Sequence, residues 1–341
     1  MNYSIIVPVF NRPDEVDELL QSLCGQTFKD FEVIIVEDGS SIPCKEVVDR
    51  YDGQLAIKYF AKPNSGPGQS RNYGVERAQG DYVVIVDSDA VLPTGYLQAI
   101  EDELTRQPCD AFGGPDAAHD SFTPIQKAIS YSMTSFFTTG GIRGGKKQME
   151  KFHPRSFNMG VRREVYQQLG GFSPMRFSKM SLYGEDIDFS IRIFKNGYSC
   201  RLFPEAWVWH KRRTDFRKFW RQVYNSGIAR INLYKKYPEA LKLVHALPAV
   251  FTVGVAALIL LSAAGRLLMY YDDADKWYWL CFAPWIPILL YALLILTDST
   301  IRNRSLKVGL LSVPAAFIQL IGYGVGFLEA WWLRCVLGQN L

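Results

Sequence analysis

Cysteine pairs at metal-binding or redox spacing are missing from this sequence. The six cysteines are scattered, none stands in a C-x-x-C arrangement, and no histidine follows them at the spacing of a zinc site. This pattern argues against a structural zinc and against a disulfide framework, and free thiols fit a reducing compartment. The cysteines are Cys24, Cys44, Cys109, Cys200, Cys281 and Cys335.

A secretory signal is also missing. The N-terminal stretch MNYSIIVPVFNRPDE has neither a basic start nor an apolar core, so we expect the first domain to stay in the cytosol. The net charge of +4 is too small to suggest nucleic acid as a partner. With 48% hydrophobic and 14% aromatic residues, the chain has ample material for a core and is not disordered.

Residues 1–215 alternate short apolar runs with amphipathic stretches. The runs stay apolar throughout and are rich in β-branched residues, which is typical of strands covered on both faces. Helical patterns between them, such as residues 13–23, complete an alternation that predicts an α/β domain with a mainly parallel, Rossmann-like sheet. Ligands bind beyond the carboxyl ends of such strands. The apolar runs cover residues 3–9, 31–36, 55–60 and 82–86.

Residues 245–341 have a different character. Three stretches without charged side chains, residues 246–265, 277–297 and 308–328, are each about 20 residues long, the length that crosses a hydrocarbon core. Three buried helices of a soluble domain are the alternative, but they would leave almost no polar surface. The pattern therefore predicts an α-helical transmembrane region with about three helices.

Charged residues indicate how this region is oriented. Cations are concentrated before the first apolar stretch and between the second and third, whereas the loop between the first and second holds Asp272, Asp273 and Asp275. The positive-inside rule then places residues 1–215 and the 298–307 loop in the cytosol, and the C-terminus outside. The cations include Lys211, Arg212, Arg213, Arg217, Lys218, Arg221, Arg230, Lys235, Lys236, Lys242, Arg302, Arg304 and Lys307.

Residues 216–244 link the two parts. Phe219, Val223, Gly227 and Ile231 recur there at helical spacing, and the cations fall mostly off that stripe. The pattern predicts an amphipathic helix that lies in the membrane interface beside anionic lipid. An ordinary helix packed on the first domain is the alternative.

Two carboxylates, Asp87 and Asp89, follow the apolar run of residues 82–86. Because the chain turns where a strand ends, both can face one site and hold Mg²⁺ or Mn²⁺ against a diphosphate. An Asp-x-Asp motif alone is a weak signal, and a solvated turn is the alternative. The strand before it and the surrounding sheet pattern favour the metal site.

Acids also gather at a predicted helix start, in Gly184-Glu185-Asp186. Acids at this position commonly cap a helix and oppose its dipole. The functional interpretation is a general base that removes the proton of an acceptor hydroxyl, with the neighbouring charge raising one of the two pKa values. Asp188 and Arg192, at i and i+4, fit a pair within one helix.

A glycine-bearing loop at residues 64–72 precedes a further helix start. Backbone N–H groups there suit phosphate, and Arg71 adds a cation that can bind a diphosphate bidentately. In the turn at residues 37–40, the Asp38 carboxylate can accept hydrogen bonds from a base N–H or from ribose hydroxyls. A capped helix with a surface arginine and a plain Asp-Gly turn are the alternatives.

Taken in order, these motifs resemble those of glycosyltransferase family 2, which has the GT-A fold. They are residues 8–12 (PVFNR), 37–40 (EDGS), 64–72 (NSGPGQSRN), 87–89 (DSD) and 183–186 (YGED). No single motif is decisive, but the ordered set is specific and covers about residues 1–215. The resemblance implies an inverting transferase with a nucleotide-diphosphate sugar as donor, uridine being the most frequent base in the family.

The resemblance also implies roles for individual residues. Asp186 would be the base, Glu185 would help to position the acceptor, and Asp38 would meet the nucleotide base. His210 would complete the metal shell or touch the diphosphate, although a lone histidine is as often structural. The implied metal ligands are Asp87, Asp89 and His210, and the implied nucleotide-sugar site contains Pro8, Asn11, Asp38, Asn64, Gly66, Arg71, Asp87 and Asn158.

Two further features have equally plain alternatives. Asn158 sits in a segment resembling the family's donor and acceptor pocket, and it is either a sugar contact or a turn residue. The glycine-rich residues 139–147 form either a mobile lid, with Arg143 and Lys146 as contacts to an anionic acceptor, or an idle surface loop.

The leading functional hypothesis is sugar transfer to a hydroxyl of a membrane-associated acceptor, such as a lipid-linked saccharide, at the cytosolic face of the bilayer. The runner-up is a polyprenyl-phosphate glycosyltransferase, whose acceptor is already an anion and needs no base. A processive polysaccharide synthase is disfavoured because three spans are few and no Q-x-x-R-W motif occurs. A non-catalytic, nucleotide-sugar-binding membrane scaffold is the alternative from another class. The sequence indicates no oligomeric state.

Overall fold

The computed structural model describes residues 2–117, 122–140, 152–173, 184–271 and 277–339. The chain forms two compact units, and each is described by itself. The α/β unit comprises Met1–Asp120, Gly144–Arg176 and Leu182–Lys211, and the helical unit comprises Ser121–Arg143, Phe177–Ser181 and Arg212–Leu341. Tyr183, most of the 139–147 loop with Arg143 and Lys146, and the acidic residues Asp272, Asp273 and Asp275 lie outside the described residues.

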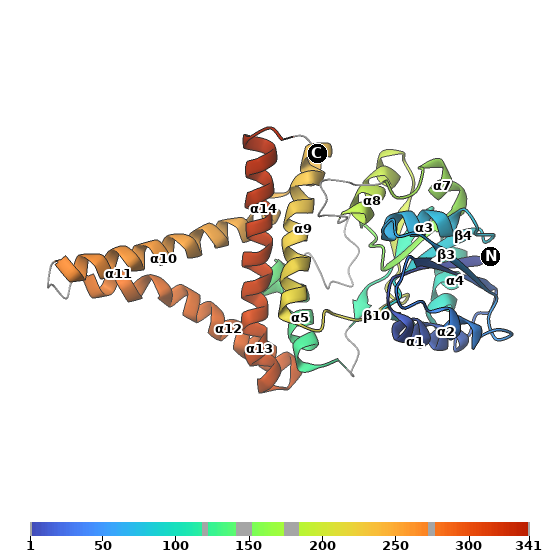
Figure 1. Cartoon of the computed structure of the whole chain (residues 1–341), viewed down its shortest axis with the longest axis horizontal. Coiled ribbons are helices and arrows are strands. Elements are labelled where there is room, and N and C mark those ends of the chain that lie inside the picture. The colour runs from blue at the N-terminus through green and yellow to red at the C-terminus, as the bar shows by residue number, and fades with distance from the viewer. Residues whose placement is uncertain (1, 118–121, 141–151, 174–183, 272–276, 340–341) are drawn as a thin grey trace. The chain divides into compact units, whose positions relative to one another are not determined.

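A seven-stranded sheet with the order β3-β2-β1-β4-β8-β6-β9 forms the centre of the α/β unit (Figure 1). The first four strands run parallel to one another, and β8 runs antiparallel to both of its neighbours. The predicted mainly parallel α/β architecture is confirmed. The strands are β1 (Tyr3–Val9), β2 (Phe31–Asp38), β3 (Ile57–Lys62), β4 (Tyr82–Val86), β6 (Ala111–Gly113), β8 (Asn158–Arg162) and β9 (Cys200–Leu202).

Helices cover both faces of this sheet, which explains why the central strands are apolar on both sides. Val16, Leu19, Leu20 and Leu23 form the buried stripe of α1, and they pack with α2 and α4 against one face. On the other face α3, α7 and α8 enclose a second core. The helices are α1 (Pro13–Cys24), α2 (Lys45–Asp49), α3 (Pro67–Val75), α4 (Tyr96–Arg106), α7 (Arg163–Gln168) and α8 (Glu185–Lys195).

A small second sheet, with the order β5-β10-β7, lies next to the point where β4 ends. Its strands are β5 (Ala90–Val91), β7 (Asp116–Ala117) and β10 (Val208–His210). His210 pairs in antiparallel register with Ala90. This pairing brings a histidine from late in the sequence beside the carboxylates that follow β4.

Among its described residues, the helical unit contains three helices that are long and apolar enough to cross a membrane: Leu247–Tyr271, Tyr278–Asn303 and Leu306–Val336. The first two begin one residue after the predicted stretches, and all three extend beyond the predicted C-terminal ends. The elements are α5 (Pro124–Thr134), α6 (Phe136–Thr139), α9 (Phe216–Lys236), η1 (Pro238–Ala240), η2 (Leu243–His245), α10 (Leu247–Tyr271), α11 (Tyr278–Phe282), η4 (Ala283–Trp285), α12 (Ile286–Asn303), α13 (Leu306–Phe317), η5 (Ile318–Gly322), α14 (Tyr323–Trp331) and η6 (Trp332–Val336).

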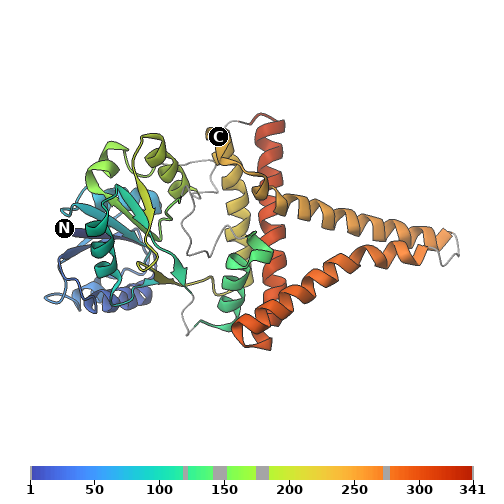
Figure 2. The ribbon, with the colours of Figure 1, turned by 180° about the vertical axis from the view of Figure 1, so that it is seen from behind.

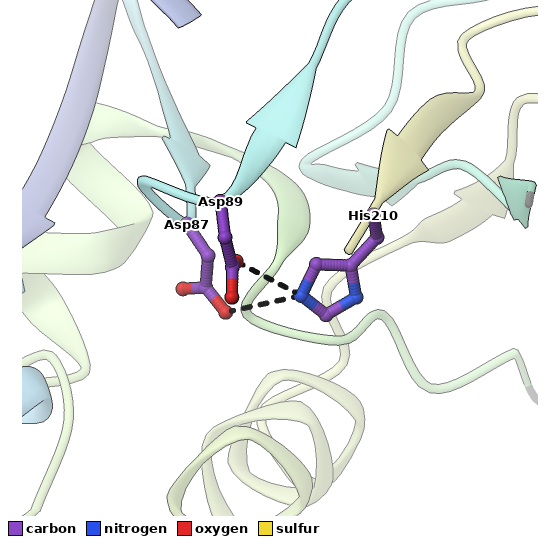
Figure 3. Close-up of side chains that lie close together, drawn as sticks. All are labelled: Asp87, Asp89 and His210. Atoms are coloured by element: carbon purple, nitrogen blue, oxygen red, sulfur yellow. Dashed lines mark ion pairs between the residues drawn. The ribbon is translucent and has the colours of Figure 1, made fainter. Parts of the chain in front are cut away.

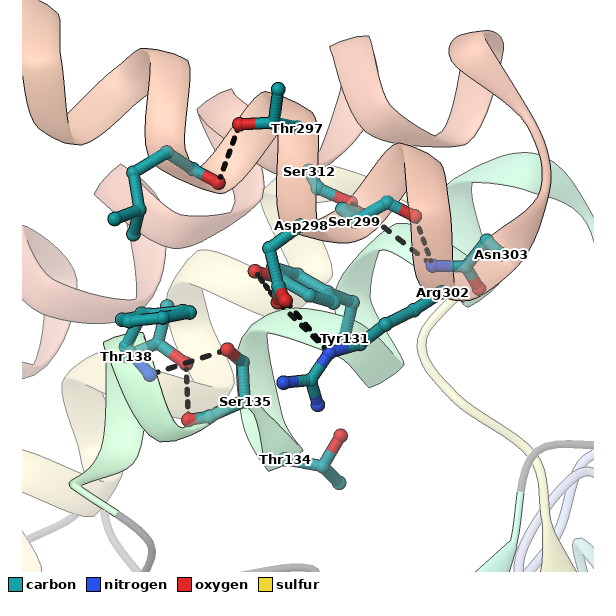
Figure 4. Close-up of polar contacts among 12 residues, drawn as sticks. Tyr131, Thr134, Ser135, Thr138, Thr297, Asp298, Ser299, Arg302, Asn303 and Ser312 are labelled. Carbon is teal, nitrogen blue, oxygen red and sulfur yellow. Dashed lines mark hydrogen bonds and ion pairs between the residues drawn. The ribbon is translucent and has the colours of Figure 1, made fainter.

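The helix α5 belongs to this unit, although its sequence lies within residues 1–215. Its apolar face packs with Phe219 and Val223 of α9 and with Val308 and Ala315 of α13. Its Tyr131 hydroxyl donates a hydrogen bond of 2.7 Å to Asp298 of α12, whose carboxylate also pairs with Arg302 at 2.9 Å (Figure 4). A segment between two strands of the α/β unit is thereby fixed to the apolar helices.

Candidate active site

Three side chains that can ligate a metal ion converge beyond the carboxyl end of β4 (Figure 3). Asp87 and Asp89 follow this strand directly, and His210 ends β10. The imidazole Nε2 of His210 lies 3.2 Å from a carboxylate oxygen of Asp89 and 4.0 Å from one of Asp87. One ligand atom from each residue lies within 4.8 Å of the others.

The carboxylate of Asp89 is buried and surrounded by positive partners. Although burial alone would raise its pKa, His210 and Arg12 together hold the pKa of this carboxyl below its ordinary value. Arg12 forms an ion pair with Asp89, and the ring of Phe157 stacks on that of His210 at 4.8 Å. Asp89 is therefore ionised, and the imidazole is fixed against an aromatic face.

Arg71 connects this cluster to the start of α8. Its guanidinium is buried, lies 2.8 Å from a carboxylate oxygen of Asp87 and lies 3.9 Å from one of Glu185. The ring of Phe172 covers the cation at 5.2 Å. The candidate metal ligands and the candidate acceptor residues thus share one cation, although more than ninety residues separate them in sequence.

Glu185 and Asp186 open α8 directly after Gly184, whose φ of 96° lies in the left-handed region that favours glycine. Burial, moderated by Arg71 but reinforced by Asp186 and Asp188, raises the pKa of Glu185 to about 7. Its carboxylate lies against the first turn of α3, where a Cβ on Gly68 would approach it to 2.3 Å. Glu185 therefore occupies the helix start at which the sequence predicted phosphate.

Asp186, the predicted base, is more exposed than Glu185. One carboxylate oxygen lies 2.7 Å from Nε of Arg155, and the other accepts a hydrogen bond of 2.9 Å from the backbone N–H of Ile187. Arg155 keeps more than a third of its side chain exposed. The carboxylate is thus held in place by a partner that can itself turn toward solvent or ligand.

Asp38 organises the loop at the end of β2 and β3. Its carboxylate accepts hydrogen bonds of 2.9 Å from the backbone N–H groups of Ser65 and Gly66, and it pairs with Lys62. The side chain of Asn64 donates to the Asp38 carbonyl at 2.8 Å. Gly66, with a φ of 93°, then leads into α3. The structure brings Asp38, Asn64 and Gly66 together, and internal contacts already use both oxygens of Asp38.

Three other predicted site residues have structural contacts. Asn11 accepts hydrogen bonds from the backbone N–H groups of Ser41 and Ile42 at 2.8 and 3.0 Å. Asn158 is buried, accepts from the Tyr96 hydroxyl at 2.7 Å and donates to the Ala206 carbonyl at 2.8 Å. Pro8 lies within β1. These contacts favour the structural alternative for Asn158, and its proposed sugar contact stays a prediction.

Sequence reasoning overlooked the positive side chains that hold the acids. Arg12 is the last residue of the motif PVFNR at residues 8–12. Arg155 lies just before the segment around Asn158 that resembles the family's donor and acceptor pocket. An arginine in a loop is usually exposed to solvent, so only the tertiary position of these two side chains identifies their partners. The predicted pair of Asp188 with Arg192 is present, with Nε 3.0 Å from the carboxylate, and Asp188 is fully buried.

The donor set at Asp87, Asp89 and His210 fits Mg²⁺ or Mn²⁺. Two carboxylates and an imidazole leave several coordination positions for diphosphate oxygens or water. Asp89 has a lowered pKa and offers an ionised ligand without a proton to displace. The ligand atoms are close enough together to surround one ion.

Comparison with known proteins identifies the α/β unit. Residues 4–170 match the family described as Glycosyl transferase family 2. An uncharacterized glycosyltransferase of Rickettsia felis is 33% identical over 141 residues, which are 41% of this chain and 22% of that protein. The GalNAc(5)-diNAcBac-PP-undecaprenol beta-1,3-glucosyltransferase of Campylobacter jejuni is 34% identical over 113 residues, which are 32% of this chain and 37% of that protein. The chain therefore spans well under half the length of these relatives.

Among solved structures, the mannosyltransferase PcManGT from Pyrobaculum calidifontis, in complex with GDP-Man and Mn²⁺, has the same fold. Its TM-score is 0.59, with 99% of this chain and 88% of that chain covered at 17% identity. An identity this low supports a shared fold and nothing finer. The sequence match, the shared fold and the strand-end carboxylates together lead to one conclusion. The chain carries a glycosyltransferase family 2 domain with the GT-A fold, followed by three long apolar helices.

Proposed function

We propose that this protein is a metal-dependent inverting glycosyltransferase that moves a sugar from a nucleotide-diphosphate donor to a hydroxyl of a membrane-associated acceptor. The observation that carries the proposal is the convergence of Asp87, Asp89 and His210 at one strand end, with Arg71 joining this cluster to Glu185. A divalent cation bound there supplies positive charge to the leaving diphosphate.

Asp186 is the proposed general base. It accepts the proton of the acceptor hydroxyl while that oxygen bonds to the anomeric carbon of the donor sugar. The bond from this carbon to the diphosphate oxygen breaks, and its electron pair leaves with the nucleoside diphosphate. A single displacement inverts the anomeric configuration. Arg155 holds the Asp186 carboxylate in place at 2.7 Å until the acceptor arrives.

Asp38, Asn64, Gly66 and Arg71 belong to the proposed donor site. Asp38 keeps the loop of Asn64 and Gly66 closed, and its carboxylate edge is the proposed contact for the nucleotide base. Arg71 is the proposed phosphate contact, since its guanidinium lies between the metal cluster and α8. A UDP-linked donor is proposed because uridine is the most frequent base among the donors of the family.

The acceptor is proposed to be a lipid-linked glycan at the cytosolic membrane face. The three apolar helices would keep the α/β unit at a membrane, and the Campylobacter relative is named as an enzyme of an undecaprenol-linked saccharide. The second candidate is transfer to a polyprenyl phosphate. The partly exposed side chain of Arg155 favours it, because an acceptor phosphate can replace Asp186 as its partner.

Hydrolysis of a panel of nucleotide sugars by the purified full-length protein tests this proposal. Water replaces the acceptor, so we expect release of nucleoside diphosphate from one donor, dependent on added Mn²⁺ or Mg²⁺ and abolished by EDTA. The His210→Ala variant should need more metal for the same rate, whereas His153→Ala should behave like the parent. Metal-independent release would contradict the proposed metal dependence, and no turnover of any donor would contradict the proposal and favour the scaffold.

Acceptor chemistry is tested separately. With the hydrolysed donor fixed, the protein is given a polyprenyl-diphosphate-linked saccharide or a polyprenyl monophosphate. Transfer to the saccharide with inversion supports the hydroxyl acceptor, and transfer to the monophosphate alone supports the second candidate.

A further inference from the structure

The three apolar helices differ in how much of their surface the protein itself covers. In the most apolar 18-residue stretch of each helix, the buried share is 6% for Leu247–Tyr271, 11% for Tyr278–Asn303 and 44% for Leu306–Val336. Leu260 and Leu289, for example, are 70% and 60% exposed. Helices that are apolar on every side and uncovered by protein require lipid around them. The first two helices meet this condition, and the third does not.

The helices also differ in direction. Within the helical unit α10 and α12 project together as a hairpin, whereas the continuous helix formed by α13 and α14 runs across the base of that hairpin (Figures 1 and 2). The start of α10 crosses the third helix at Gly324, where a Cβ would come within 2.1 Å of the Thr252 hydroxyl and 2.5 Å of the Pro248 carbonyl. If the hairpin runs along the membrane normal, the third helix does not.

The third helix also has a polar neighbour along its length. α9 packs on it so closely that a Cβ on Gly227 would approach the Tyr323 carbonyl to 2.2 Å, and one on Gly326 the Tyr224 carbonyl to 2.1 Å. The Tyr224 hydroxyl donates to Glu329 of the third helix at 2.5 Å. If the third helix crossed the bilayer, α9 would be drawn in with it. Burying one arginine such as Arg230 at the bilayer centre costs about 3 kcal/mol.

Charges and aromatic residues agree with a position in the headgroup layer. The turn between α12 and α13 carries Arg302, Arg304 and Lys307, all exposed, and exposed cations flank α9 at both ends. Trp331 and Trp332 near the end of the third helix are 45% and 53% exposed. Cations are attracted to the anionic cytosolic leaflet, and tryptophan is enriched at the membrane–water boundary.

We infer that only the α10 and α11–α12 hairpin crosses the bilayer, and that α9 with the third apolar helix lies along the cytosolic headgroup layer of anionic lipid. Two crossings return the chain to the side on which it started. The C-terminus then lies on the same side of the membrane as α9. The length of residues 308–328, taken alone, would instead predict a third crossing that places the C-terminus on the opposite side. This inference concerns the membrane position of the helical unit and is independent of the donor and acceptor chemistry proposed above.

Cysteine labelling of the full chain in sealed cells tests the inference. Tyr271→Cys, Ser305→Cys and Gln339→Cys are single additions at the hairpin tip, at the α12–α13 turn and near the C-terminus. A membrane-impermeant maleimide is applied before and after permeabilisation, with the parent chain as the baseline for its native cysteines. We expect Tyr271→Cys to be labelled from outside, and Ser305→Cys and Gln339→Cys to be labelled only after permeabilisation.

Two results would overturn the inference. Labelling of Gln339→Cys from outside, at the rate of Tyr271→Cys, would mean that the third helix crosses the bilayer. Failure of Tyr271→Cys to react before permeabilisation would mean that the hairpin does not cross. An epitope tag after residue 341 of the unmodified sequence gives an independent readout, because external protease should remove it only from permeabilised cells. Donor hydrolysis by each variant reports folding separately.

Discussion

Both the α/β unit and the helical unit have buried apolar clusters, but they differ in what else they bury and expose. In the α/β unit all five residues of β4 are buried, and so are charged groups such as Arg71, Asp89 and Asp188, each with an ionic partner. In the helical unit large apolar side chains such as Leu260 are exposed. The same exposed fraction thus has opposite meanings in water and in lipid. Buried charged groups indicate the functional site in the α/β unit. Exposed apolar side chains indicate lipid as the solvent of the helical unit.

The largest expected effect tests whether the acids of the α/β unit act chemically or only cap a helix. Asp186→Asn removes the proposed base but keeps the shape of the side chain, so transfer to a hydroxyl acceptor should fall about 10²- to 10⁴-fold. Nucleotide affinity, measured by calorimetry, should stay within about twofold. Asp102→Asn on the exposed side of α4 is the matched control and should keep full activity. Unchanged transfer by Asp186→Asn would reduce this acid to a helix cap.

The next effect tests lipid as the solvent of the hairpin. Leu260→Arg places a cation on a lipid-facing position and should destabilise insertion by about 3 kcal/mol, seen as a lower yield of membrane-embedded protein after carbonate extraction. Leu243→Arg, at a side chain that is 91% exposed but lies before α10, should insert normally. Equal extraction of both variants would indicate that Leu260 faces water or protein.

The pH dependence of stability tests the buried charge of Glu185. Its pKa is raised from 4.5 in the unfolded chain to about 7 in the fold, so the folded state binds the extra proton between these values. Stability from this group is fully present below about pH 4.5 and is lost as pH rises through about 7, by no more than about 3 kcal/mol.

Metal-free protein in EDTA should therefore lose thermal stability over this window, and Glu185→Gln should flatten that slope. Glu164→Gln, at an exposed position on α7, is the control and should keep the parent slope. A Glu185→Gln profile that follows the parent would assign the pH dependence to another group.

The smallest expected effect compares two glycines. A Cβ on Gly160 in β8 would lie 1.9 Å from the Phe112 ring, so Gly160→Ala should destabilise the α/β unit by about 1–3 kcal/mol. Gly254 in α10 has nothing within 4 Å, so Gly254→Ala should be neutral or stabilise by up to about 1 kcal/mol. Thermal unfolding in one detergent checks both, and a destabilising Gly254→Ala would reveal a packing partner on the hairpin.

Much of the site was predictable because its parts are local signals at strand ends. Asp38, Asp87 and Asp89 stand at or directly after the ends of apolar strands. Their position at the carboxyl edge of the sheet therefore follows from local sequence alone. The role of His210 was less certain, because a lone histidine after a short strand has many explanations. Only its register opposite Ala90 brings it to the carboxylates. Arg155 carried no local signal, and the motif that contains Arg12 did not reveal its partner Asp89.

The sequence by itself determined the first four parallel strands, where the first acids stand and which helices are apolar enough for a membrane. Those properties depend on periodicity and hydrophobicity within a few turns of chain. Only the tertiary structure decided that Arg71 joins Asp87 to Glu185, that α5 packs on α13, and that the third apolar helix runs across the hairpin. These outcomes depend on close packing between segments distant in sequence, such as Gly227 and Gly326 at the α9–α14 contact, and local composition does not encode that direction.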